Sequence, residues 1–310
     1  MSINKFWNRE YPIAKQLGMI HMFHSVERVL NIKCKRSNYK VAQKHHALMR
    51  RFLDCKFSSF TPSLQLSGQD HLKECIWVLW LQGEENAPQL VKKCISSIRK
   101  HANGHPVILL TADNITEYVH FPEYIQKKYA KGIITNQNYS DLIRFYLLSH
   151  YGGLWCDATI FITAPLPQEI FLYDFYSGKQ HVYSEIADFV PDGKWCAFLL
   201  ESKPGNNITT LEYELMLHYW KDEEHLVDYY LVDYIMDYLY RHNEECRKLI
   251  DKVPYNNQDI FKVVDNLNVN VSSHEFENLI QNNVFQKLSW RVTPSNDSQT
   301  YYNRLINLLR

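Results

Sequence analysis

The chain has 310 residues, of which 45% are hydrophobic, so a folded domain is expected and a disordered chain is excluded. Its 34 basic and 34 acidic residues balance, which argues against a nucleic-acid-binding protein, because such a protein needs a basic surface. The seven cysteines form no CxxC pair, which argues against a disulfide framework or zinc site and favours a reducing compartment, the cytoplasm.

Nothing in the sequence predicts export or a membrane span. Residues Met1–Glu10 carry charges and contain no apolar run, so we expect no signal peptide. No apolar run approaches the ~20 residues that a membrane span needs. If the protein works at a membrane, we expect it to act peripherally, at the inner surface.

The first part of the chain differs from the rest. Residues 1–70 have basic residues among apolar ones at helical spacing and predict a helical N-terminal extension, with a turn-rich linker at Ser58–Gly68. The adjacent His45 and His46 point in different directions on a helix, and the pattern places them on the surface. Residues 71–310 are expected to form the main domain.

Alternating strand and helix patterns follow the linker. Apolar runs predict the strands, and apolar positions at helical spacing predict the helices. The predicted strands are Cys75–Leu81, Pro106–Leu110, the short Ile133–Thr135 and Leu154–Thr163. The predicted helices are one that contains Val91, Cys94, Ile95 and Ile98, then Asn114–Tyr118, Pro122–Lys131 and Ser140–His150. This order is typical of an α/β fold with a mostly parallel sheet and helices on its faces.

The second half is less regular. Strands are predicted at His181–Ile186 and Trp195–Leu200, and helices at Ile208–Trp220, Leu226–Arg241 and Gln299–Leu309. Asp233 and Asp237 stand one helical turn apart in one of these helices. That spacing could serve an acceptor, but a solvated helix face is the simpler interpretation.

Two charges interrupt an otherwise apolar helix. Asp141 and Arg144 are three residues apart in Ser140–His150 and therefore lie on one face. They could form a structural ion pair that orients the helix. Alternatively, they could point into a cleft and bind sugar hydroxyls.

A single carboxylate lies in the apolar strand that follows. Gly152 and Gly153 precede the strand and let the backbone approach whatever lies beyond the turn. Strand alternation places Trp155, Asp157 and Thr159 on one face. A buried Asp157 needs a partner, which could be a divalent metal on a pyrophosphate, a sugar hydroxyl or Arg144. It could also cap a neighbouring turn.

These residues carry a resemblance to a known family. Ser140-Asp141-Leu142-Ile143-Arg144 and Tyr151-Gly152-Gly153-Leu154-Trp155-Cys156-Asp157 resemble the segment of retaining glycosyltransferases that contains a DxD motif, among them yeast-type mannosyltransferase initiators and clostridial glucosylating toxins. The closer similarity is to bacterial capsular polysaccharide synthesis proteins. It rests also on Ile76-Trp77, Trp80, Gln82-Gly83, Ala87-Pro88, Asp157-Ala158-Thr159-Ile160-Phe161 and Pro165-Leu166-Pro167. It covers residues 74 to 310 and does not explain residues 1–70.

The resemblance implies a Rossmann-like fold of the GT-A type that binds a nucleotide sugar, with Mn²⁺ or Mg²⁺ at the pyrophosphate. By this resemblance Trp80 would stack on the base, although the pattern alone places Trp77 and Trp80 in the core. Asp141 and Arg144 would hold donor-sugar hydroxyls, and Asp157 would be the first DxD carboxylate, so these three would be the catalytic residues. Gly152 and Gly153 would also bind the donor. The family's second, metal-binding carboxylate is replaced by Thr159, a weaker ligand for a hard cation.

The sequence therefore predicts a glycosyltransferase that moves a sugar from a nucleoside diphosphate sugar to a carbohydrate acceptor, with retention, in capsular or surface polysaccharide synthesis. Two alternatives are a catalytically weak sugar-nucleotide or glycan-binding component and a hydrolase with paired carboxylates. We expect metal dependence through Asp157 and Thr159, the alternative being neutralisation of the diphosphate by basic side chains.

Overall fold

The computed structural model describes residues 39–63, 72, 74–180 and 189–309. The predicted strand His181–Ile186 and most of the predicted N-terminal extension lie outside these residues. No helix among the described residues is long and apolar enough to cross a membrane.

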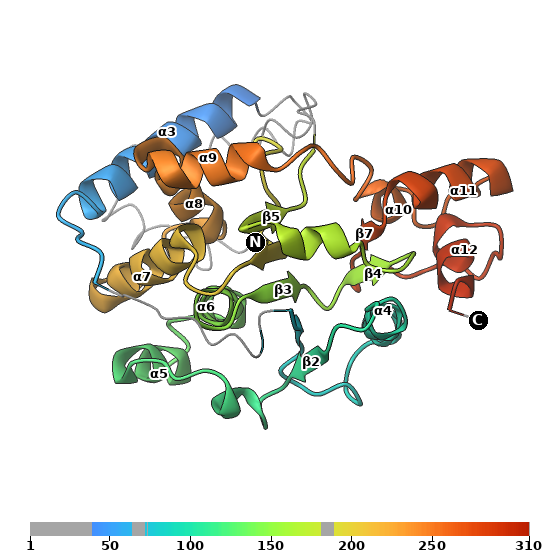
Figure 1. Ribbon diagram of the computed structural model, residues 1–310, viewed down its shortest axis with the longest axis horizontal. Helices are drawn as coiled ribbons and strands as arrows, with labels where there is room; N and C mark the ends of the chain where they lie inside the picture. Colours follow the sequence, from blue (N-terminus) through green and yellow to red (C-terminus); the bar gives the residue numbers. More distant parts are fainter. Residues whose placement is uncertain (1–38, 64–71, 73, 181–188, 310) are drawn as a thin grey trace, which may run out of the picture.

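A five-stranded sheet forms the centre of the fold (Figure 1). Its strand order is β2-β1-β3-β6-β5, in which β1 pairs in parallel with β2 and β3, and β6 runs antiparallel to both of its neighbours. The expected α/β fold with a mostly parallel sheet is confirmed. The bounds are β1 Ile76–Leu79, β2 Val107–Leu110, β3 Gly153–Cys156, β5 Phe175–Ser177 and β6 Leu199–Ser202.

The buried helix α6 (Asn136–His150) lies beside β3 and is viewed almost end-on in Figure 1. It begins four residues earlier than predicted because Thr135 accepts a hydrogen bond from the backbone of Asn138 and caps it. The cap replaces the predicted strand Ile133–Thr135, which is absent. The other helices of the first half are α4 Gln89–Lys100, η2 Ile115–Glu117 and α5 Glu123–Ala130.

The predicted strand Leu154–Thr163 is two strands in two sheets. After β3 the chain turns at Asp157–Thr159 and continues as β4 (Ile160–Ile162). β4 pairs antiparallel with β7 (Phe285–Lys287), a strand that the sequence did not predict. The turn matters because it removes Asp157 and Thr159 from regular strand alternation.

Four helices pack together on one side of the sheet in Figure 1: α3 (Tyr39–Lys56), α7 (Asn207–Asp222), α8 (Leu231–His242) and α9 (Glu244–Lys252). The helix α3 packs on α8, where Arg50 forms two hydrogen bonds, of 2.9 and 3.0 Å, to the Asp237 carboxylate. The expected solvated face of α8 is wrong, because Asp233 and Asp237 are both buried.

The two histidines of α3 also differ from expectation. His45 and His46 are buried, the first 2.8 Å from Asp228 and the second 2.8 Å from the Tyr234 hydroxyl. Each histidine has a polar partner, and this hydrogen bonding allows its side chain to be buried where α3 packs on the second half of the chain.

A second, smaller core joins α4 and β4 to the C-terminal helices. Phe161 of β4 contributes to it, and so do Leu90 and Cys94 of α4. This packing fixes β7 against β4, and it therefore positions the residues at the end of β7. The C-terminal helices are α10 Lys262–Asp265, α11 Ser273–Asn282 and α12 Tyr301–Asn307. Earlier in the chain, the short helix η3 (Gln168–Leu172) follows β4.

Candidate functional site

A cavity of about 850 Å³ opens at the carboxyl-terminal edge of the parallel strands. Trp80 follows β1, Asp157 follows β3, and both line the cavity. Because β1 and β3 are parallel neighbours, their carboxyl ends meet at one edge, where open α/β sheets bind ligands. The volume suits a small organic ligand.

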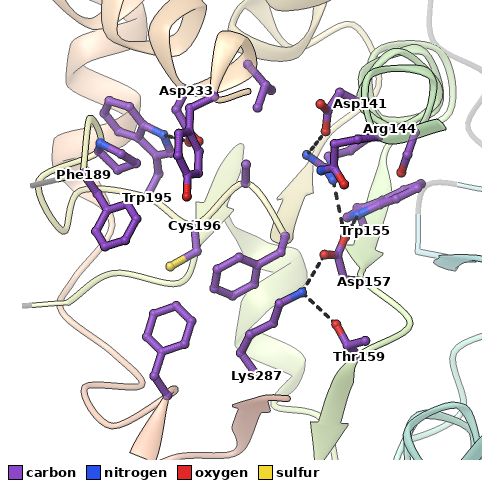
Figure 2. Close-up of a pocket in the computed structure, with 18 of the residues that line it drawn as sticks. Asp141, Arg144, Trp155, Asp157, Thr159, Phe189, Trp195, Cys196, Asp233 and Lys287 are labelled. Carbon is purple, nitrogen blue, oxygen red and sulfur yellow. Dashed lines mark hydrogen bonds and ion pairs between the residues drawn. The ribbon is translucent and has the colours of Figure 1, made fainter. Parts of the chain in front are cut away.

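One wall of the cavity is a chain of charges (Figure 2). Arg144 Nη1 lies 3.0 Å from Asp141 Oδ1, and Arg144 Nη2 lies 3.4 Å from Asp157 Oδ1. The guanidinium also lies 5.1 Å above the Trp155 ring, whose Nε1 donates a 2.9 Å hydrogen bond to Asp157 Oδ1. Arg144 thus connects two carboxylates that lie on α6 and after β3.

The two carboxylates of this wall differ in pKa. Burial raises the pKa of Asp141 to about 6, although the charge of Arg144 opposes the shift. Burial would also raise the pKa of Asp157, but the charges of Lys287 and Arg144 outweigh it and hold that pKa below its usual range. Asp157 is therefore anionic at neutral pH.

Lys287, which lies near the C-terminus of the chain, is the last charged residue of this wall. Its Nζ donates to Asp157 Oδ2 at 2.7 Å and to Thr159 Oγ1 at 2.8 Å, as Figure 2 shows. The Phe198 ring lies 4.8 Å from the ammonium. Asp157 and Thr159 converge on this ammonium because the turn between β3 and β4 brings them together.

Among the described residues, buried polar atoms without a hydrogen-bond partner occur on the cavity-lining residues and include Trp80 Nε1, Asp141 Oδ1 and Arg144 Nε. The 3.0 Å ion pair of Asp141 is too poorly aligned to count as a hydrogen bond. A buried polar atom without a partner is costly. These atoms belong to residues that line the cavity, so a polar ligand there would be the nearest source of partners.

The opposite wall carries Trp195, Asp233 and Phe189 (Figure 2). Trp195 Nε1 donates a 3.0 Å hydrogen bond to Asp233 Oδ1. Burial raises the pKa of Asp233 to about 7, against the effect of that hydrogen bond. The aromatic side chains of Phe189, Tyr229 and Tyr230 line the cavity and are 41 to 50% exposed.

The structure brings five of the predicted site residues together in one cavity: Trp80, Asp141, Arg144, Asp157 and Thr159. Trp77 is buried in the core, as the pattern predicted, whereas Trp80 is only partly buried. The edge of the Trp80 ring meets Trp290 with centroids 6.5 Å apart.

Gly152 and Gly153 were also predicted to bind the donor, but the structure places them outside the cavity. They are buried at the amino-terminal end of β3 and do not line the cavity. Both have positive φ, and a Cβ on Gly153 would lie 2.4 Å from the Cys75 carbonyl oxygen. Their role in this structure is close packing of the chain at that end, and donor contact is not supported there.

The sequence analysis missed Lys287 and the pairing of Trp195 with Asp233. Lys287 ends a three-residue strand whose partner is more than 120 residues away, so no local pattern indicates it. The sequence did contain one indication that Asp233 needs a partner, because it is a carboxylate on an apolar helix. Its hydrogen-bond donor, Trp195, lies in a distant loop and could not be identified from the local pattern.

The donor atoms present do not fit a resident divalent metal. Such an ion takes about six oxygen ligands, with carboxylates prominent among them. Asp157 is one carboxylate already bonded to three donors, and Thr159 is neutral. No group of three or more His, Cys, Asp or Glu side chains that could hold a metal occurs within residues 39–63, 72, 74–180 and 189–309.

The fold is that of an α/β protein with a cavity at the carboxyl edge of its central sheet. The family model of the capsular polysaccharide synthesis proteins matches residues 30–305, and the chain belongs to this family. The match begins upstream of residue 71 and includes all of α3.

Two glycosyltransferases are similar to parts of the chain. The O-glycosyltransferase braB of Annulohypoxylon truncatum is 28% identical over an alignment of 139 residues, which covers 42% of this chain and 30% of that protein. Among solved structures, the PaToxG glycosyltransferase aligns with 79% of this chain and 95% of its own, at 12% identity and a TM-score of 0.37. The chain spans less than a third of the length of the curated relative.

Proposed function

We propose that this chain is a GT-A-type glycosyltransferase that moves a sugar from a nucleoside diphosphate sugar to a carbohydrate acceptor, with retention, in surface polysaccharide synthesis. The observation that carries the proposal is that residues lining the cavity hold buried polar atoms without a hydrogen-bond partner, among them Trp80 Nε1, Asp141 Oδ1 and Arg144 Nε. A sugar offers many hydroxyls, each of which can donate and accept, which suits a lining that presents both donors and an acceptor.

The donor would lie along the wall that carries Arg144. Asp141 Oδ1 and Arg144 Nε would bind donor-sugar hydroxyls, and the base would stack near Trp80 and Trp290. The diphosphate would lie near Lys287, which is the cation at the partly exposed end of the charge chain. Holding the sugar at several points supplies the positioning that transfer requires.

The acceptor would occupy the opposite wall. Exposed aromatic rings there, Phe189, Tyr229 and Tyr230, offer flat apolar faces for the C–H faces of sugar rings. Asp233 Oδ1 is held by Trp195, so its carboxyl group has a fixed orientation toward an acceptor hydroxyl. In this proposal, donor and acceptor would face each other across one cavity.

A panel of nucleoside diphosphate sugars tests the proposal by thermal stabilisation, followed by mass spectrometry of the products with oligosaccharide acceptors. A bound donor should raise the melting temperature by mass action, and Arg144→Met should remove the shift. Arg247→Met, an exposed arginine of α9 outside the cavity, is the matched control. Stabilisation without a transfer product would favour the binding component instead, and absence of both would refute the proposal.

A further inference from the structure

The ammonium of Lys287 stands between the two side chains that would otherwise be expected to hold a metal. Its distances are 2.7 Å to Asp157 and 2.8 Å to Thr159. A lysine ammonium carries three N–H donors. Two are used by these oxygens, and the third remains for a ligand in the cavity that Lys287 lines.

The protein fixes this ammonium from several directions. Lys287 pairs with Ile160 in the β4–β7 ladder, and the backbone N–H of Leu288 donates a 2.8 Å hydrogen bond to the Thr159 carbonyl. The Lys287 side chain is 20% exposed and passes the Phe198 ring. Backbone hydrogen bonds therefore hold the segments of Lys287 and Thr159 together. The side-chain contact between them is thus supported by the backbone, unlike that of a lysine that moves freely on the surface.

The carboxylate of Asp157 is correspondingly occupied. One oxygen accepts from Trp155 and Arg144, and the other accepts from Lys287. A divalent cation at Asp157 would have to displace Lys287, and only one neutral hydroxyl would join Asp157 as a ligand. Displacement would also leave a partly buried ammonium without its anion.

We propose that Lys287 supplies the positive charge that a divalent metal would bring to the donor diphosphate, so that nucleotide binding by this chain needs no metal. Asp157 and Thr159 then orient the ammonium, and its third N–H donates to a phosphate oxygen. This inference rests on the proposed function, because it takes the ligand to be a nucleoside diphosphate.

Isothermal titration calorimetry of the full chain with UDP, GDP, ADP, CDP and dTDP tests it. Each titration is done once in EDTA and once with MnCl₂ or MgCl₂. At least one nucleotide should bind in EDTA, with a Kd that the added cation changes by less than about threefold. Lys287→Met should weaken that binding by roughly tenfold or more, as expected for loss of a charge-assisted hydrogen bond.

Two further variants control for folding and for net charge. Lys287→Arg keeps a cation and should retain part of the binding. Lys252→Met removes the same charge from an exposed lysine of α9 and should leave the Kd unchanged. Circular dichroism and the melting temperature show whether each variant is folded.

The outcomes separate the two proposals. Binding that disappears in EDTA and returns with Mn²⁺ or Mg²⁺ would overturn the role of Lys287 while leaving the proposed function intact. Metal-free binding that a folded Lys287→Met retains at full strength would also overturn it. Failure of all five nucleotides under every condition would overturn the proposed function, and this inference with it.

Discussion

The indole of Trp195 donates its only hydrogen bond to Asp233, across the cavity from the wall formed by Arg144 and Asp157. A neutral donor therefore holds a carboxyl group that is 8% exposed and has no cation hydrogen-bonded to it in the described structure. Burial of this pair makes Asp233 one of the cavity residues whose protonation should respond to pH near neutrality.

Asp233→Asn should remove one pH dependence of stability. The folded pKa of Asp233 is about 7, above the usual value of 3.8, so the folded state binds more protons between these pH values. Stability from this group is complete below the unfolded pKa and is lost as the pH rises through the folded pKa. Between about pH 5 and about pH 7 the unfolding free energy of the wild type should fall by about 2 kcal/mol relative to the variant.

Urea unfolding of both proteins at several pH values measures this difference. Asn keeps a carbonyl oxygen for Trp195, and other titrating groups such as Asp141 are common to both proteins. A difference that stays constant with pH would show that Asp233 titrates normally.

Asp157→Asn should abolish transfer and also lower stability. Removing the charge of an isolated carboxylate from an apolar strand would stabilise the folded protein. Here, however, the change would leave Arg144 and Lys287 without their anion. We expect a loss of about 1–3 kcal/mol, less than for a fully buried pair because Asp157 is partly exposed. Denaturant unfolding and transfer assays check this, with Asp113→Asn on the exposed surface as the control. Full activity in the folded variant would contradict it.

Arg144→Lys should lower kcat/KM by roughly tenfold or more with a smaller effect on folding. Lysine keeps the charge but cannot contact Asp141 and Asp157 together with a planar fork, nor present Nε to a ligand. Steady-state kinetics and melting curves separate the two effects, with Arg247→Lys as the control. A lower melting temperature with unchanged transfer would mean that the ion pair is only structural.

Thr159→Asp should weaken metal-free nucleotide binding. A second carboxylate 2.8 Å from Lys287 Nζ would share the ammonium and add a negative charge beside the phosphates. We expect the Kd in EDTA to rise by roughly tenfold, and Mn²⁺ to recover the binding. Calorimetry in EDTA with and without Mn²⁺ measures both. If the wild-type chain depends on a metal, the same change should tighten binding, which is the opposite sign.

Gly153→Ala should act on stability and not on the donor. The added Cβ would meet the Cys75 carbonyl oxygen at 2.4 Å, and φ is +91°. The backbone would have to move, which we expect to cost several kcal/mol, on the order of the larger core substitutions. Gly104→Ala is a control, since its φ is also positive but nothing lies within 4 Å of its Cβ. A folded Gly153→Ala with a much weaker nucleotide Kd would show donor contact after all.

Local patterns were enough to predict the elements that carry most of the site. The apolar run at β1 and the nearly all-apolar helix α6 were both predicted, and they carry Trp80, Asp141 and Arg144, which line one cavity. Helix periodicity also indicates that Asp141 and Arg144 share a face. These features depend on residues close together in sequence, and that is why sequence alone predicts them.

The rest depends on contacts between distant segments. The turn at Asp157–Thr159 ends strand alternation because β4 joins a different sheet, whose partner strand is only three residues long. His45 and Asp237 looked like surface residues, since their partners Asp228 and Arg50 lie more than 180 residues away. A polar side chain becomes a core residue only when such a partner arrives, and local patterns contain no information about it.

The pairing of β4 with β7 has a consequence for synthesis. Asp157 leaves the ribosome 130 residues before Lys287 does. The central strands β1, β2 and β3 precede the turn, so their sheet can form while the carboxylate of Asp157 still lacks its ammonium. The site is therefore incomplete until translation has passed residue 287, and a chain shortened before β7 would keep the central strands but lack that charge. Premature termination just before β7 would therefore disrupt the ligand site while leaving the strands of the central sheet present.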